Sequence, residues 1–181
     1  MKEISLNILD ITENSVKAGA TLTEITVNET DDTLTLKISD NGCGMTAETL
    51  KAVTDPFYTT RTTRKVGMGL PLLKMEAEQT GGTFDISSKA ESEYPEDHGT
   101  EVTAVFNKKH IDYTPLGDVV SSIVTLIQGH PDTDFLFTHT CGDKSVTLDT
   151  RELRAVLEEV PLNSYEVLKF IEETLRKEEN I

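Results

Sequence analysis

The sequence has little positive charge, little cysteine and no long apolar run, and each shortage excludes a class of protein. Its 181 residues carry 17 Lys and Arg against 32 Asp and Glu, which gives a formal net charge of -15. A phosphate backbone or an anionic membrane repels so acidic a chain, so we expect neither nucleic acid nor a membrane as a partner. No apolar stretch approaches the roughly 18 residues that a membrane span needs.

Cysteine is limited to Cys43 and Cys141, which lie far apart and lack the paired spacing of a metal or disulfide motif. The chain opens directly into patterned sequence, with no signal-peptide core. We therefore expect a protein of the reducing cytoplasm. The length of 181 residues suits one domain, or one domain with a small appendage.

Residues 1–18 predict a helix with two different faces. Ile4, Ile8 and Ile11 recur at helical spacing, and Gly19 follows where a helix C-terminus favours a left-handed residue. A second set of residues, short and polar except for one lysine, shares another face: Asn7, Asp10, Asn14 and Lys17. These groups are either an ordinary polar face or a set that looks into a pocket and holds a metal-phosphate unit.

Residues 40–45, Asp-Asn-Gly-Cys-Gly-Met, follow two alternating segments that predict an antiparallel strand pair at 23–28 and 33–39. The carboxylate of Asp40 can accept a hydrogen bond from an exocyclic amine, and the two neighbouring glycines let the backbone approach a flat ring. This combination suits adenine, although Asp-Asn-Gly is also common turn chemistry.

A short helix is expected at 47–54, capped by Thr46, and a basic, hydroxyl-rich segment follows at 57–65. Its cations either face a negative ligand or offset neighbouring carboxylates. The segment runs into Gly67-Met68-Gly69-Leu70 and a helix predicted at 71–79. Glycines before a helix N-terminus expose backbone N-H groups and the positive end of the helix dipole, an arrangement that binds phosphates.

The rest of the chain predicts two further strands and then a small α+β appendage. The strands are expected at 83–88 and 101–106, and Gly99-Thr100 could bring a hydroxyl towards the base. In the appendage we expect a helix capped near Thr114, a hairpin of 135–137 with 146–148, and two final helices. We interpret His139 and Cys141 as exposed hairpin residues, with half of a metal site as the alternative. We also interpret His98 and His130 as surface histidines.

Five of these segments resemble, in order, the motifs of the GHKL ATPase superfamily of gyrases, heat-shock chaperones, histidine kinases and MutL proteins. The segments are 10–20, 40–45, 55–61, 67–70 and 99–100. The resemblance covers residues 1–108 and implies an α+β fold, a two-layer α/β sandwich with a mixed, mostly antiparallel sheet under three helices. We expect this ATP-binding domain to be followed by the appendage, residues 109–181.

The resemblance also implies the ligand and the roles of individual residues. Mg-ATP would bind between the first helix and the basic segment, with Asn14 coordinating Mg2+ and Asp40 binding the adenine amine. Thr100 would assist through a water molecule. The nucleotide-binding residues expected in this way are Asn14, Lys17, Asp40, Gly42, Gly44, Met45, Thr59, Thr60, Arg61, Arg64, Lys65, Gly67, Met68, Gly69, Leu70 and Thr100.

The short basic segment looks most like the histidine kinases and anti-sigma kinases, and the Gly-Ala-Thr at 19–21 looks more like mismatch-repair proteins. Of the two, we favour the kinase branch. Asp10 stands where many members carry a Glu that orients the attacking water, and it is one methylene shorter, which puts fast hydrolysis in doubt. Lys65 replaces the first glycine of the kinase glycine motif, so Lys65 or Arg64 could reach a phosphate. No phosphoacceptor domain precedes the first motif, so we expect the acceptor on another protein.

Two functions of different class follow from the sequence. In the first, the chain transfers the γ-phosphoryl group of ATP to a partner protein in signal transduction, with Asp10 as the catalytic base. In the second, it is a non-catalytic or slowly hydrolysing module, in which ATP orders the basic segment and a partner protein reads that state. The oligomeric state is open, and a homo-oligomer is possible.

Overall fold

The structure is a computed structural model that describes residues 3–54 and 68–179. The helices are α1 (Ile4–Lys17), α2 (Ala47–Thr54), α3 (Gly69–Gln79), α4 (Val119–Gly129), α5 (Thr150–Leu157) and α6 (Tyr165–Glu178). The strands are β1 (Leu22–Glu29), β2 (Thr33–Asp40), β3 (Thr83–Lys89), β4 (Gly99–Asn107), β5 (Asp134–Cys141) and β6 (Lys144–Asp149). Each helix and strand expected from the sequence is present, with ends displaced by a few residues.

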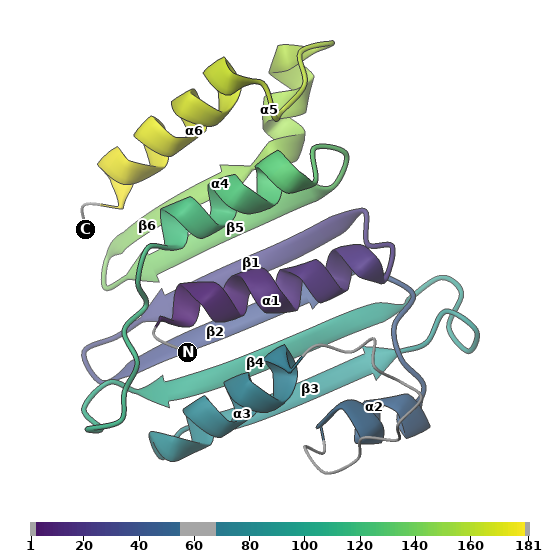
Figure 1. Cartoon of the computed structure of the whole chain (residues 1–181), viewed down its shortest axis with the longest axis vertical. Helices are drawn as coiled ribbons and strands as arrows, with labels where there is room; N and C mark the ends of the chain where they lie inside the picture. Colours follow the sequence, from purple (N-terminus) through teal and green to yellow (C-terminus); the bar gives the residue numbers. More distant parts are fainter. Residues whose placement is uncertain (1–2, 55–67, 180–181) are drawn as a thin grey trace.

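The strands form one six-stranded sheet in the order β3-β4-β2-β1-β5-β6 (Figure 1). Neighbouring strands are antiparallel except for β1 and β5, which are parallel. The expected mixed, mostly antiparallel sheet is therefore confirmed. A parallel pair needs a long crossover connection, and the described part of the chain between β1 and β5 contains three strands and three helices, β2 to α4 in chain order.

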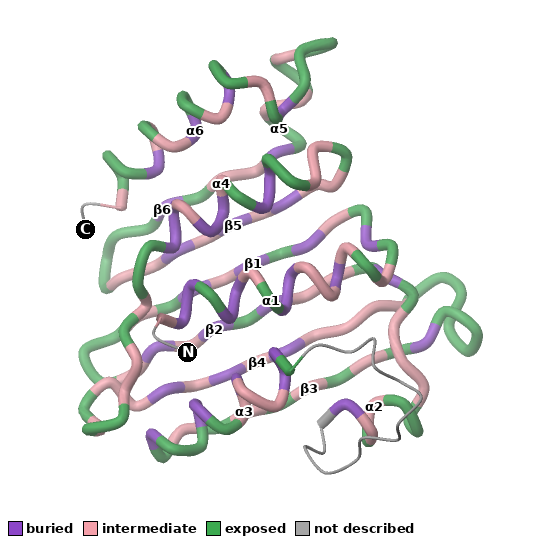
Figure 2. The backbone as a smooth tube through the Cα atoms, viewed as in Figure 1, coloured by how far each residue is buried: buried purple, intermediate pink, exposed green. Residues whose placement is uncertain are grey.

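Helices α1, α3 and α4 lie against one face of this sheet, which gives the expected two layers (Figure 1). Alternation along each strand explains why: Ile25 and Val27 of β1 are fully buried, whereas Glu24, which precedes Ile25, is exposed. Figure 2 shows the same change of burial from residue to residue along the strands. Ile4 and Ile8 bring α1 down onto this apolar face.

The C-terminal part of the chain continues the same sheet and core. Phe135 and Phe137 of β5 belong to the apolar cluster that also contains the isoleucines of α1. The first N-H groups of α1 are bound by the segment before α4, since the N-H of Ile4 donates to the carbonyl oxygen of Pro115 at 3.0 Å. Ser5 N-H donates to the carbonyl oxygen of Leu116 at 2.8 Å. The division of the chain at residue 108 stays a proposal, and any such division cuts through one sheet.

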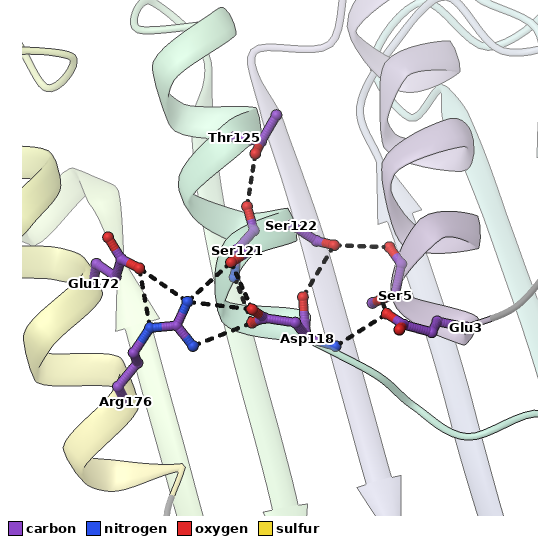
Figure 3. A network of polar contacts seen from close by, with 8 residues as sticks. All are labelled: Glu3, Ser5, Asp118, Ser121, Ser122, Thr125, Glu172 and Arg176. Carbon is purple, nitrogen blue, oxygen red and sulfur yellow. Dashed lines mark hydrogen bonds and ion pairs between the residues drawn. The ribbon is translucent and has the colours of Figure 1, made fainter.

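The expected cap near Thr114 is wrong, because α4 begins later, with Asp118 as its N-cap. The side chain of Asp118 accepts a hydrogen bond from the N-H of Ser121 at 2.9 Å. Its carboxylate also contacts Arg176 of α6 at 3.2 Å, and its own N-H donates to Glu3 at 3.3 Å. Figure 3 shows how this network joins the starts of α1 and α4 to α6.

The expectation of an exposed His139 is also wrong. His139 is only 5% exposed, because it shares the buried face of β5 with Phe135 and Phe137. Its Nδ1 lies 2.8 Å from Glu179 and its Nε2 lies 3.1 Å from Glu29, so the side chain sits between two carboxylates. Cys141 is half-buried and unpaired.

The other two histidines interpreted as surface residues are half-buried. The Nε2 of His130 lies 2.7 Å from Oε1 of Glu13, and the ring of His98 contacts Gly42. Within residues 3–54 and 68–179, no group of three or more His, Cys, Asp or Glu side chains is arranged to hold a metal ion. In the same residues, no helix combines the length and the apolar character that crossing a membrane requires.

Candidate functional site

A cavity of about 580 Å³ opens between α1, the end of β2, the start of β4 and the start of α3. This volume is within the usual range for a small-molecule site. Its lining is apolar on most sides and carries a few polar groups. The lining residues are Ile11, Asn14, Ser15, Lys17, Ala18, Ile38, Asp40, Gly44, Met45, Leu70, Thr100 and Val102.

The structure brings together residues from most of the predicted motifs. The expected site residues that line the cavity are Asn14, Lys17, Asp40, Gly44, Met45, Leu70 and Thr100. Gly42, Met68 and Gly69 lie within two residues of these in the chain, and Asp10 lies one helical turn before Asn14, but none of the four is among the lining residues. Thr59, Thr60, Arg61, Arg64, Lys65 and Gly67 lie outside the described residues, so their predicted roles stay predictions.

Asp40 is the last residue of β2, and both of its carboxylate oxygens are fixed by neighbours. The hydroxyl of Ser15 on α1 donates to Oδ2 at 2.6 Å, and the N-H of Gly42 donates to Oδ1 at 2.9 Å. Each carboxylate oxygen can accept a second hydrogen bond. The carboxylate is therefore oriented in advance and can accept a donor from a ligand in the cavity.

Residues 41–45 are packed tightly between the end of α1 and the segment after β3. The N-H of Cys43 donates to Ala18 and its carbonyl accepts from Glu91, both at 2.9 Å. Gly44 has a φ of +62°, and a Cβ there would lie 1.9 Å from the carbonyl oxygen of Lys89. Gly44 is thus required by the packing of this loop, a second reason for glycine beside the predicted approach of a flat ring.

Thr100 lies directly opposite Asp40 in the ladder between β4 and β2, so both side chains reach the same end of the cavity. The hydroxyl oxygens of Thr100 and Ser88 are 2.8 Å apart. Ser88 also accepts a hydrogen bond from the N-H of Met45 at 2.8 Å. The hydroxyl predicted near the base is therefore held by a serine that the sequence did not reveal.

Asn14, the expected metal ligand, lies on α1 and lines the cavity. Its Nδ2 is buried and has no hydrogen-bond partner among the described residues. Its side-chain oxygen, Oδ1, is not among the buried atoms that lack a partner. Because hard cations such as Mg2+ bind oxygen ligands, the residue fits a metal-bound phosphate group at this point.

Asp10 is exposed and stands beside the first turn of α3. A Cβ on Gly69 would lie 3.1 Å from the Cβ of Asp10, so the start of α3 approaches α1 closely. The N-cap of α3 is Met68, and among the described residues no side chain caps this helix. The N-H groups of its first turn suit an anionic ligand next to Asp10.

Ser15 is the most informative residue that the sequence reasoning missed. It follows Ile4, Ile8 and Ile11 at helical spacing, so it belongs to the stripe that faces the sheet and is 3% exposed. A serine on an apolar stripe needs a polar partner, and this signal could have been read from the sequence. Ile38 and Val102, which are apolar walls of the cavity, were likewise not predicted as site residues.

Residues 2–110 match the family described as histidine kinase-, DNA gyrase B-, and HSP90-like ATPase. A probable C4-dicarboxylate sensor kinase of Bacillus subtilis is 33% identical over 86 residues, which are 48% of this chain and 15% of the relative. Sensor protein SrrB of Staphylococcus aureus is 33% identical over 94 residues, 49% of this chain and 16% of that protein. The chain thus matches only a small part of the length of these relatives.

Solved structures share the fold at low sequence identity. The MutL ATPase domain of Aquifex aeolicus, complexed with ADP, is 14% identical with a TM-score of 0.52, over 87% of this chain and 70% of that one. The N-terminal domain of a DNA repair protein is also 14% identical, with a TM-score of 0.55, over 82% of this chain and 53% of that one. Together with the match over residues 2–110, these findings establish that the chain belongs to the histidine kinase-, DNA gyrase B- and HSP90-like ATPase family.

Proposed function

We propose that the protein binds Mg-ATP in the cavity beside α1 and transfers the γ-phosphoryl group to a partner protein in signal transduction. The observation that carries this proposal is that Asp40 and Asn14 line one cavity, with the Asp40 carboxylate already oriented by Ser15. Membership of an ATPase family names ATP as the ligand. The similarity to sensor kinases favours a signalling role.

Each part of the nucleotide has a partner among these residues. The exocyclic amine of adenine would donate to Asp40, with Thr100 nearby, and the ring would lie against Ile38 and Val102. The phosphates would extend towards Asn14 and the N-terminus of α3. When bound, Mg2+ neutralises phosphate charge, and Asn14 is the residue that would hold it.

The proposed catalytic base is Asp10, which stands beside the start of α3. Its role would be to accept the proton of the attacking group, which requires hydrogen-bond reach. The predicted cations Arg61, Arg64 and Lys65 would neutralise charge that develops on the phosphate. In phosphoryl transfer, positioning and electrostatics supply most of the catalysis, so the protein would mainly hold the reacting groups in place and neutralise their charge.

A second function, an ATP-gated binding module with slow or no hydrolysis, is favoured by a specific connection. The first N-H groups of α1 are bound by Pro115 and Leu116, and Asp118 then links α4 to Arg176 of α6. Nucleotide bound along α1 would thus act, through the N-terminus of α1, on the segment that precedes α4. A partner that contacts α4 or α6 could read the state of the cavity.

ATP labelled on the γ-phosphate separates the two functions. Transfer of label from Mg-ATP to a co-purified protein supports the kinase. Tight ATP binding with no label transfer and little ADP formation supports the gated module and contradicts the kinase. The Asp10→Asn variant is the matched control, because it should abolish transfer while ATP affinity stays within about threefold of wild type.

A further inference from the structure

Asn7 belongs to the polar stripe of α1 that was expected to look into the pocket, but it does not line the cavity. It is fully buried, and its Nδ2 donates to Oε2 of Glu76 at 2.6 Å. Glu76 lies on α3 and is 7% exposed. The bond joins residues 69 positions apart in the chain and connects two helices through their buried faces.

Joining two helices through a buried polar pair has a cost in free energy. Burying a carboxylate and an amide costs desolvation energy that an apolar pair of the same volume does not incur. The Oδ1 atom of Asn7 is also buried without a hydrogen-bond partner among the described residues, which adds to this cost. Stability alone therefore does not explain the pair, whereas a hydrogen bond fixes direction and register in a way that apolar packing does not.

The helices that the pair joins also approach each other at the start of α3, which faces the proposed phosphates. Gly69, at the start of α3, approaches Asp10 so closely that a Cβ would lie 3.1 Å from the aspartate's own Cβ. Asn7 is one helical turn before Asp10, and Glu76 is two turns after Gly69. The two helices therefore contact each other at a close backbone approach and, about 11 Å further along α3, at this buried hydrogen bond.

We propose that Asn7 and Glu76 form a positioning pair that fixes the N-terminus of α3 against α1 and thereby sets the affinity for the phosphates of the nucleotide. The pair touches neither the nucleotide nor the metal. It acts through Gly69 and the N-H groups of the first turn of α3. This inference rests on the proposed function, because it presumes that a nucleotide occupies the cavity.

The two ends of the nucleotide should respond differently when the pair is removed. Adenosine would contact Asp40 and Thr100, which are held by β2, β4 and Ser15 and not by α3. The phosphates would need α1 and α3 at a fixed spacing. A loosened α3 should therefore weaken ATP and leave adenosine binding unchanged.

The test is calorimetric titration of the full chain with Mg-ATP and, separately, with adenosine. In the double variant Asn7→Leu with Glu76→Met, apolar groups of similar size replace the pair, so the variant should fold with a melting temperature at or above that of wild type. We expect its Kd for Mg-ATP to rise about tenfold or more, which corresponds to about 1.4 kcal/mol, while its Kd for adenosine changes less than about twofold.

Two further variants make the test specific. Glu76→Gln retains an oxygen that can accept from Asn7, so ATP affinity should stay within about threefold of wild type. Glu78→Gln alters a carboxylate on the exposed side of the same helix and should have no effect. If the double variant does not fold, Asn7→Ser, which shortens the donor, provides the same comparison of ATP with adenosine.

The outcomes separate this inference from the proposed function. Failure of the wild-type chain to bind Mg-ATP contradicts the proposed function and the inference with it. A wild type that binds Mg-ATP, together with a folded double variant of unchanged ATP affinity, overturns the positioning role alone. Equal weakening of ATP and adenosine also overturns it, because that result indicates general loss of the pocket.

Discussion

The hydroxyl of Ser15 on α1 donates a hydrogen bond to Oδ2 of Asp40 at the end of β2, across 2.6 Å. The bond crosses from the helix layer to the sheet layer and ends on a carboxylate that lines the cavity. With the N-H of Gly42 on the other oxygen, the carboxylate is held in one orientation before a ligand arrives. Such preorganisation raises affinity because less freedom is lost on binding.

Removing the Ser15 hydroxyl should therefore weaken nucleotide binding, because the Asp40 carboxylate loses the hydrogen bond that orients it. We expect Ser15→Ala to raise the Kd for Mg-ATP about tenfold, since a hydrogen bond to a charged group contributes about 1.5–3 kcal/mol and part of this is lost to solvent. Asp40→Asn should abolish binding while the fold is retained. Calorimetry measures both, with Ser39→Ala on the same strand as the control. An unchanged Kd in Ser15→Ala would contradict the preorganisation of Asp40.

The loop that follows Asp40 depends on Gly44. We expect Gly44→Ala to lower stability by about 2 kcal/mol or more, because its Cβ would overlap the Lys89 carbonyl and its φ is +62°. Gly129 is the control, since nothing lies within 4 Å of a Cβ added there. Denaturant unfolding of both variants provides the measurement. Equal stability of Gly44→Ala and wild type would show that the loop does not pack as described.

The position of His139 predicts how stability depends on pH. A neutral imidazole has one N-H and can donate to only one of its two carboxylate neighbours, Glu179 and Glu29, so the arrangement favours the imidazolium. Burial opposes the charge, but the two carboxylates outweigh it and raise the pKa of His139 above its ordinary value. Lys108, 2.7 Å from Glu29, and Tyr113 are further titratable groups near Glu29.

Because the folded-state pKa of His139 is raised, its contribution to stability is fully present below about pH 6.5 and is lost as the pH rises through the folded-state pKa. The melting temperature should fall over that range, and His139→Gln should remove this part of the pH dependence. Thermal unfolding from pH 5.5 to pH 8.5 measures it, with His110→Gln, at a half-buried histidine outside this cluster, as the control. Parallel curves for wild type and His139→Gln would refute the assignment.

Residues 1–108 should not fold cooperatively on their own, even though the family match covers nearly the same range. Truncation exposes β1 as an edge, removes Phe135 and Phe137 from the core, and leaves the first N-H groups of α1 without Pro115 and Leu116. We expect a broad thermal transition and rapid amide exchange in α1, in contrast with the full chain. A sharp transition in the truncated chain would support residues 1–108 as an independent domain.

The sequence predicted local structure well because the signals for it are local. Alternation at 23–28 and 33–39 fixed the inward face of β1 and β2, and Thr46 caps α2 as expected, accepting from Thr49 N-H at 3.3 Å. Polar groups of α1 and β2 could be assigned to one pocket because the family motifs occur in order. Thr114 was chosen as a cap since hydroxyl residues favour this position, yet the first turn of α4 is completed by Asp118.

Contacts between distant segments could not be predicted from the sequence. The parallel pairing of β5 with β1 joins Ile25 to Phe137 across more than a hundred residues, and no periodicity marks it. His139 alternates with Phe135 and Phe137, so its burial could have been inferred, but its partner Glu179 lies on another element. The bond from Asn7 to Glu76 is likewise visible only when α1 and α3 are packed.

A crystal structure of the protein with Mg2+ and a non-hydrolysable ATP analogue tests the central claim most directly. The account predicts that the adenine amine lies within about 3 Å of the Asp40 carboxylate, that Asn14 contacts the metal, and that the phosphates reach the first turn of α3. A nucleotide bound outside this cavity, or one whose base lies away from Asp40, would contradict the account.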